Sequence, residues 1–128
     1  MLLVEPDPET RTLGAFMLRR LGYRVAEARS GLDALRLYDE EDGGFDLLLA
    51  EAAMPRMNGH DLAEQLRARR SNLRVLLLAD NAYVRLARRA AAQKGLGLLS
   101  RPFTMASLAA GVREALDKGR TMAAGNRA

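Results

Sequence analysis

The chain has 128 residues, 48% of them hydrophobic, and a net charge of +4. This length supports one domain with a packed core and is short for two. The absence of cysteine excludes disulfide bonds and thiolate metal sites. The apolar stretches are too short to span a membrane, and the start, Met1 to Glu5, lacks the basic and apolar regions of a signal peptide. We therefore expect a cytoplasmic location and no membrane partner.

The charge is distributed unevenly along the chain. Residues 1–60 carry 7 arginines and no lysine against 11 acidic residues, a net of −4, whereas residues 61–128 carry 13 basic and 5 acidic residues, a net of +8. The arginines between positions 67 and 89 could form solvent-exposed helix faces or contact nucleic acid. Only 5% of the residues are aromatic, so few side chains can stack on bases. We favour exposed helix faces, and a nucleic-acid partner is not expected.

Strand and helix patterns alternate from the amino terminus onward. The expected strands are short apolar or alternating segments at residues 2–4, 23–26, 45–50, 75–78 and 96–99. The helices between and after them have predicted amino-terminal caps at Asp7, Ser30, Asn81 and Thr104. The first two helices have predicted core-facing stripes at Leu13, Met17 and Leu21, and at Leu32, Leu35 and Tyr38. Gly119 should end the last helix, which leaves a flexible tail at residues 119–128.

Five strands that alternate with five helices predict an α/β fold with a parallel sheet covered on both faces. Right-handed crossovers restrict the topology to a doubly wound, flavodoxin-like sheet. Open sheets of this kind place their functional site at the carboxyl ends of the strands. Glu5 and Glu51 come directly after strand-like runs, and Pro55 and the Asn58-Gly59 pair turn the chain after Glu51. We expect Glu51 in a pocket at this edge, and a solvated loop acid is the alternative.

Three segments, in this order and spacing, resemble the receiver domain of two-component response regulators: Leu3 to Pro8, Asp46 to Gly59 and Ser100 to Phe103. The resemblance covers residues 1–118, and the segment 46–78 is most similar to receivers at the carboxyl end of hybrid histidine kinases. It implies a CheY-like fold with strand order 2-1-3-4-5. It also implies a role in phosphorelay signalling, with a sensor histidine kinase or phosphotransfer protein, a downstream output domain and a second copy as candidate partners.

The resemblance implies a pocket in which an aspartate accepts the phosphoryl group while an acid pair helps to hold Mg²⁺. In this sequence the phosphoacceptor position is Glu51, and the acid pair is Glu5 and Pro6. Pro6 has no side-chain ligand to offer, and the neighbouring Asp7 is better placed as a helix cap. We therefore expect a weak or absent Mg²⁺ site with only Glu5 and Glu51 as ligands, and no cofactor.

Three further positions of the resemblance depart from the family pattern. Ala79 stands at the hydroxyl position, Leu98 at the position of the switch aromatic, and Arg101 at the lysine position. Glu51 is one methylene longer than aspartate, and Arg101 can bind a carboxylate through two parallel hydrogen bonds, although it could also be a surface residue. A Glu51–Arg101 pair would imitate a phosphorylated pocket in part, because a phosphoryl group carries a charge of about −1.5 to −2.

The sequence thus predicts a pseudo-receiver, a non-catalytic signalling module that binds other proteins and does not turn over phosphate. The first alternative retains phosphotransfer, with Glu51 or Asp80 as the acceptor and Mg²⁺ held by Glu5 and Asp7 in altered geometry. The second alternative is a basic nucleic-acid-binding protein, for which no recognition-helix motif is present. His60, the only histidine, is expected to be a surface residue at the start of a helix.

Overall fold

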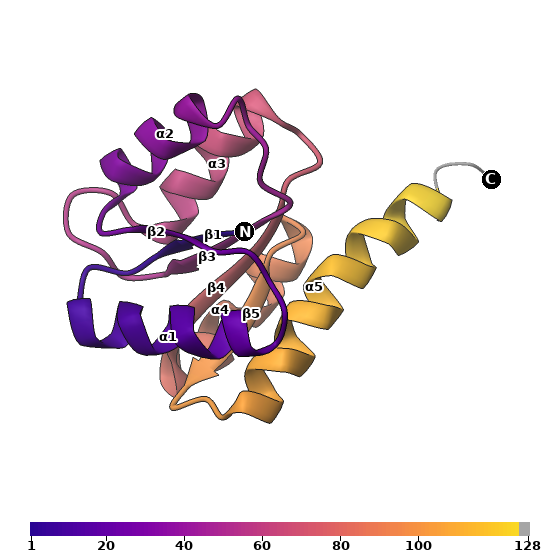
Figure 1. Ribbon diagram of the computed structural model, residues 1–128. Helices are drawn as coiled ribbons and strands as arrows, with labels where there is room; N and C mark the ends of the chain where they lie inside the picture. The colour runs from indigo at the N-terminus through magenta and orange to yellow at the C-terminus, as the bar shows by residue number, and fades with distance from the viewer. Residues whose placement is uncertain (126–128) are drawn as a thin grey trace.

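Five parallel strands form one sheet in the computed structural model, which describes residues 1–125 and the side chains of residues 1–118. The strands pair in the order β2-β1-β3-β4-β5, which confirms the predicted topology (Figure 1). Their bounds are β1 Leu2–Val4, β2 Ala26–Ala28, β3 Leu47–Glu51, β4 Arg74–Asp80 and β5 Gly97–Arg101.

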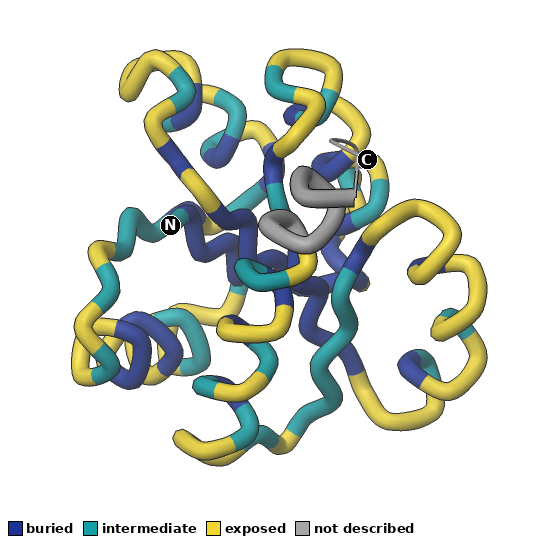
Figure 2. Tube along the Cα trace, turned by 90° about the vertical axis from the view of Figure 1, so that its right-hand side faces the viewer, coloured by how far each residue is buried: buried dark blue, intermediate teal, exposed yellow. Residues whose placement is uncertain are grey.

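Helices cover both faces of the sheet, as the alternation of elements predicted. Their bounds are α1 Pro8–Arg20, α2 Gly31–Glu40, α3 Gly59–Arg69, α4 Asn81–Gln93 and α5 Met105–Gly125. One apolar core lies under α1 and α5, and a second lies under α2, α3 and α4. Buried residues follow the central strands, and exposed residues follow the outer surfaces of the helices (Figure 2). Within the described residues no helix has the length and apolar character needed to cross a lipid bilayer.

The helix starts depend on side chains that accept hydrogen bonds from free backbone N–H groups. Asp7 accepts from the Thr10 amide and Ser30 from the Asp33 amide, so both predicted caps are confirmed. The predicted cap Asn81 is wrong. Asp80 accepts from the Tyr83 amide at 2.8 Å, and the helix therefore begins one residue earlier than expected, with Asn81 as its first residue.

The two predicted helix faces are right in part. Met17 on α1 and Tyr38 on α2 are buried as expected, whereas Leu13 is 58% exposed and Leu32 is 65% exposed, so these two leucines do not face the core. Tertiary packing sets which face of each helix is buried, and a regular leucine spacing does not report that packing.

Two predicted boundaries also differ from the structure. β2 begins at Ala26 instead of residue 23 because its register with β1 pairs Leu2 with Ala26. α5 continues past Gly119 to Gly125, since a glycine inside a helix costs only about 1 kcal/mol relative to alanine and does not by itself end it. Residues 126–128 of the expected flexible tail lie outside the described residues.

Arginines at the end of α3 hold backbone carbonyls, although we expected them on a solvent-exposed face. Arg67 donates to the carbonyl of Leu73 at 3.0 Å, of Lys94 at 2.6 Å and of Gly95 at 2.9 Å. These contacts join the end of α3 to the loop before β4 and to the end of α4. Arg70 similarly donates to the Phe45 carbonyl. Part of the positive charge thus stabilises the fold and is less available to a nucleic acid.

We expect Arg67→Met to lower the free energy of unfolding by about 2–3 kcal/mol, because three carbonyls lose a charged donor. Urea denaturation would measure the change. Arg69→Met is the matched control, since Arg69 makes an exposed 3.6 Å ion pair with Asp39 and its removal should cost less than about 0.5 kcal/mol. Equal losses in the two variants would contradict the structural role of Arg67.

Candidate functional site

The carboxyl ends of four strands bring acidic and basic side chains to one edge of the sheet. Glu51 is the last residue of β3, Asp80 the last of β4 and Arg101 the last of β5, and Glu5 directly follows β1. Asp80 and Arg101 are register partners across β4 and β5. The sequence correctly placed Glu5 and Glu51 at this edge, and the structure brings Arg101 to them.

Glu51 and Arg101 meet at this edge of the sheet. The Arg101 Nη1 atom lies 2.6 Å from Glu51 Oε2, and the side chain of Glu51 is 5% exposed while that of Arg101 is 36% exposed. The pair expected from the sequence is therefore present, and Glu51 is not a solvated loop acid. The two parallel hydrogen bonds expected between Arg101 and Glu51 are not formed. Glu51 Oε2 is buried and has no hydrogen-bond partner. The contact is a short ion pair with poor N–H alignment.

Burial raises the pKa of Glu51 from 4.5 to about 7. Loss of hydration is the largest cause, and the negative charges of Glu5 and Asp80 act in the same direction. The positive charge of Arg101 and the backbone amide of Ala53 oppose this shift without cancelling it. Burial thus favours the protonated form of Glu51 more strongly than Arg101 favours its charged form.

Glu5 shares this environment. Only 5% of the residue is exposed, and loss of hydration raises its pKa, although the Asp7 amide, at 3.4 Å from Oε2, and Arg101 favour the charged form. Arg11 donates to the Glu5 carbonyl at 2.7 Å and so fixes the loop after β1. Nothing in the sequence indicates this role of Arg11, because its position on α1 gives no sign that it reaches back to this loop.

The residues present do not fit a Mg²⁺ ion, which prefers several oxygen ligands in octahedral geometry. Pro6 offers no side-chain oxygen, and Asp7 binds both the amide and the hydroxyl of Thr10. The Arg101 guanidinium already lies beside Glu51. Among the described residues no group of three or more His, Cys, Asp or Glu side chains is placed to hold a metal.

The two positions that the resemblance assigns to a switch are apolar parts of the sheet. Ala79 on β4 is 3% exposed and is the register partner of Ser100. Leu98 on β5 is half-buried and packs against the core under α2, α3 and α4. Neither side chain can form a hydrogen bond in response to a phosphoryl group.

The turn after Glu51 depends on Gly59. Its amide donates to the Ala52 carbonyl at 2.9 Å, and a Cβ atom at this position would lie 2.7 Å from the Glu51 carbonyl oxygen. Asn58 then caps α3 by accepting from the Asp61 amide. The Asn58-Gly59 pair therefore brings α3 close to the backbone of Glu51, as the sequence predicted for a turn at this point.

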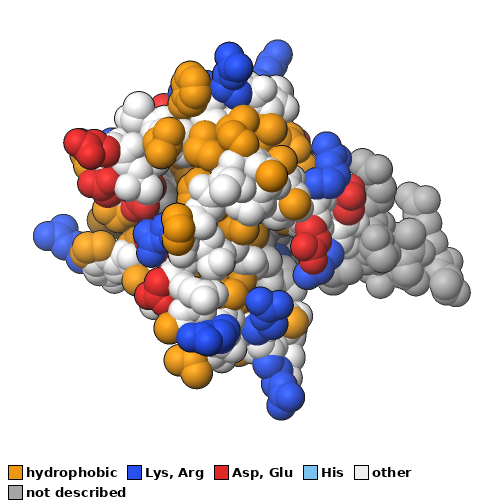
Figure 3. Space-filling model, turned by 90° about the horizontal axis from the view of Figure 1, so that it is seen from below, with side chains coloured by type: hydrophobic (Ala, Val, Ile, Leu, Met, Phe, Trp, Pro, Cys, Tyr) orange, Lys and Arg blue, Asp and Glu red, His pale blue; other side chains and the backbone are white. Residues whose placement is uncertain are grey.

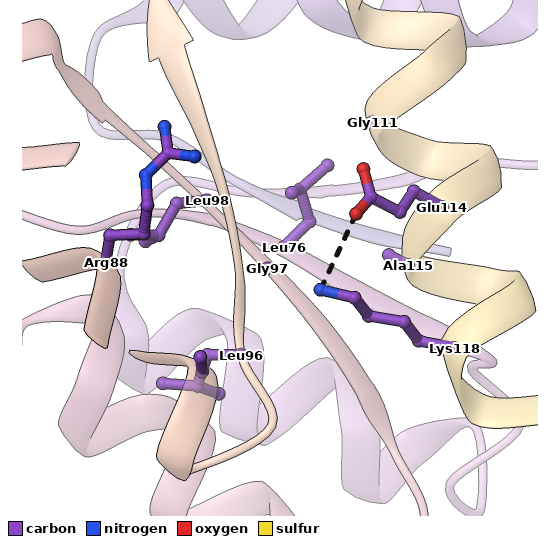
Figure 4. Close-up of a pocket in the computed structure, with 10 residues that line it drawn as sticks. Leu76, Arg88, Leu96, Gly97, Leu98, Gly111, Glu114, Ala115 and Lys118 are labelled. Carbon is purple, nitrogen blue, oxygen red and sulfur yellow. Dashed lines mark ion pairs between the residues drawn. The ribbon is translucent and has the colours of Figure 1, made fainter. Parts of the chain in front are cut away.

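A second hollow, of about 160 Å³, lies along β5 between α4 and α5 and involves none of the acidic residues above (Figure 4). Gly97 and Gly111 leave it open because they lack side chains, and Arg88 and Ala92 of α4 form one wall. Figure 3 shows the surface formed by α1 and the start of α5. On this surface apolar side chains lie among charged ones. The large exposed apolar residues of these two helices are Leu13, Phe16 and Met105.

Comparisons with known proteins agree with this architecture. A family model described as the response regulator receiver domain matches residues 1–113. The sensor kinase CckA of Brucella abortus is 34% identical over 118 residues, which cover 92% of this chain and 12% of the kinase. The uncharacterized transcriptional regulatory protein YcbL of Bacillus subtilis is 29% identical over 122 residues, which cover 90% of this chain and 50% of that protein. The chain thus spans half or less of the length of these two relatives.

Solved structures show the same fold. The crystal structure of the receiver domain from the hybrid histidine kinase CckA has a TM-score of 0.74 at 29% identity and covers 90% of this chain and 96% of that one. A response regulator receiver domain protein from Clostridium thermocellum has a TM-score of 0.83 at 20% identity, with 94% of this chain and 96% of that one covered.

The raised pKa of Glu51 predicts that this group stabilises the fold less as the pH rises. The folded state binds the proton more tightly than the unfolded chain, so this contribution is complete below pH 4.5 and is lost as the pH rises through about 7. Between about pH 5 and pH 8 the free energy of unfolding of the unmodified protein should fall. In Glu51→Gln this fall should be smaller by about 2 kcal/mol. Urea denaturation at several pH values measures this difference. The exposed-acid variant Glu64→Gln should follow the unmodified protein, and a Glu51→Gln curve parallel to both would contradict the prediction.

Proposed function

Since this chain belongs to the response regulator receiver domain family, we propose that it is a pseudo-receiver of phosphorelay signalling, in which an internal Glu51–Arg101 pair replaces phosphorylation and Mg²⁺. Receiver domains are in general non-enzymatic signalling modules. In this proposal the domain has lost phosphotransfer and acts by binding other proteins.

The 2.6 Å contact between Glu51 and Arg101 is the observation that supports the proposal best. It places a cation beside the acceptor carboxylate, so that an incoming Mg²⁺ would have to displace a guanidinium. Pro6 removes one carboxylate from the same edge, and Ala79 removes the hydroxyl. Pro6 thus weakens metal binding, the Glu51–Arg101 contact occupies the acceptor, and Ala79 removes the hydroxyl that would bind the phosphoryl group. Each of these changes weakens phosphotransfer by a different physical route.

The electrostatics of the pocket support the same conclusion. Arg101 acts on both Glu5 and Glu51, and the negative charges of Glu5 and Asp80 contribute to the raised pKa of Glu51. A phosphoryl donor would bring further negative charge into this pocket without a divalent cation to neutralise it. Burial also raises the pKa of Glu51, which favours its protonated form, and a protonated carboxyl group is a poor nucleophile.

The candidate partners are a sensor histidine kinase, a phosphotransfer protein, a downstream output domain or a second copy of the chain. The similarity to the receiver domain of CckA supports the first two, since CckA is described as a hybrid histidine kinase. The competing function is a phosphorylatable receiver with an altered acceptor, Glu51 or Asp80. Asp80 is less suited to this role because its carboxylate already caps α4.

We predict no phosphoryl adduct when the protein is incubated with a small-molecule phosphodonor and Mg²⁺, because the pocket lacks an aspartate acceptor and a complete metal site. Intact-mass measurement checks this outcome. The matched control is a repaired variant that combines Pro6→Asp, Glu51→Asp, Ala79→Thr and Arg101→Lys, which should gain the mass of one phosphoryl group. A stoichiometric, acid-stable and base-labile adduct on the unmodified protein would overturn the proposal.

A Mg²⁺ titration separates the two functions further. Under the proposal the unmodified protein shows no saturable binding at millimolar Mg²⁺, and Glu5→Ala changes nothing. Saturable binding that is lost in Glu5→Ala would support the phosphorylatable receiver instead.

A further inference from the structure

Two residues outside the acidic pocket connect the first turns of α3 and α4. His60 Nε2 and the Tyr83 hydroxyl form a short hydrogen bond, and the two rings lie 6.1 Å apart at an interplanar angle of 49°. Tyr83 is half-buried, packs against the core under α2, α3 and α4, and has a pKa raised by burial. His60 lies at the start of α3, as the sequence predicted, but it is half-buried and bonded to Tyr83 instead of fully exposed on the surface.

The other ends of the same two helices are also joined. Arg67, near the end of α3, donates to the carbonyls of Lys94 and Gly95, which directly follow α4. Both helices follow parallel strands, so their starts lie at one edge of the sheet and their ends at the other. Apart from these side chains the two helices approach each other little, since α3 packs mainly on β3 and α2, and α4 on β4 and β5.

We propose that α3 braces α4 at both ends, through His60–Tyr83 at the start and Arg67 at the carboxyl-terminal end, and so holds α4 in one position on the sheet. The brace is built from side chains outside the Glu51 pocket, so it goes beyond the proposed function and does not require it. The His60–Tyr83 contact is the end that can be released with least damage, because removing the Tyr83 hydroxyl leaves its ring in the core.

The position of α4 matters because this helix forms one wall of the hollow along β5. Arg88 and Ala92 line that wall, opposite Glu114 and Lys118 of α5 (Figure 4). The outer surface of α4 is also free of acidic residues and carries Leu86, which is 88% exposed. A brace that fixes α4 therefore fixes both the width of the hollow and the placement of this basic surface.

The test is amide hydrogen exchange in the 128-residue chain carrying Tyr83→Phe. We expect exchange of the amides of residues 85–88 to rise by roughly two- to tenfold, which corresponds to the loss of one hydrogen bond, while α1 and α5 remain unchanged. Tyr23→Phe is the matched control. It removes a tyrosine hydroxyl that contacts Arg113 of α5 at 3.4 Å, so it should leave α4 unchanged.

Substitutions at His60 complete the test. His60→Leu should reproduce the effect of Tyr83→Phe, the double variant should add no further effect, and His60→Gln, which retains hydrogen-bonding groups, should restore part of the protection. The proposal is overturned if exchange in α4 does not change, if it rises equally in every helix, or if the two substitutions act additively. A phosphoryl adduct in the previous experiment would remove the proposed function and leave this result intact.

Discussion

The burial of Glu51 at the carboxyl edge of the sheet is the constraint from which the rest of the site follows. A carboxylate in this position loses most of its hydration and faces two further acids, and one guanidinium is its main source of compensation. Desolvation is larger than the attraction to Arg101, which is why the pKa rises even though the two groups are 2.6 Å apart. A buried ion pair is favourable only when hydrogen bonds satisfy its remaining atoms, and Glu51 Oε2 lacks such a bond.

The burial of Glu51 and its contact with Arg101 bear on which cation the carboxylates at this edge can bind. A site that contains several ionised carboxylates attracts a divalent cation, and the bound cation then allows a phosphoryl group to approach. Here Pro6 removes one carboxylate, and Arg101 lies beside the second. Burial and the neighbouring acids favour the protonated form of Glu51, and Arg101 favours its charged form. Under the proposed function, the same sheet edge keeps its geometry while charge pairing replaces metal and phosphate binding.

The sequence predicted the parallel sheet and the edge at which the site lies, because these depend on the alternation of apolar runs and on local turn chemistry, and the resemblance to receiver domains supplied the strand order. β1 has the predicted bounds, and Asp7 and Ser30 cap the helices that were expected to follow them. Leu13 and Leu32 were wrongly predicted to face the core, because the packing of each helix on the sheet sets its buried face and the spacing of leucines does not report that packing. The Glu51–Arg101 pair could be expected only from the resemblance to receiver domains, which places both positions in one site. Its poor hydrogen-bond geometry and the resulting pKa could not, since both depend on burial and on the arrangement of neighbouring charges.

The contacts that the sequence could not reveal join residues far apart in the chain. His60 and Tyr83 are separated by 23 positions, and Arg67 and Gly95 by 28. No local periodicity relates such pairs, and each residue alone is consistent with a solvent-exposed helix position. Once the strand order places α3 beside α4, however, both pairs act on the same helix from opposite edges of the sheet. In a domain that has alanine at position 79, no hydroxyl is available at the end of β4 to connect the pocket to the start of α4. If α3 braces α4 as proposed, the Asp80 cap and the two contacts from α3 help to fix where that helix lies on β4 and β5. The surface formed by α4 then depends in part on side chains away from the acidic residues.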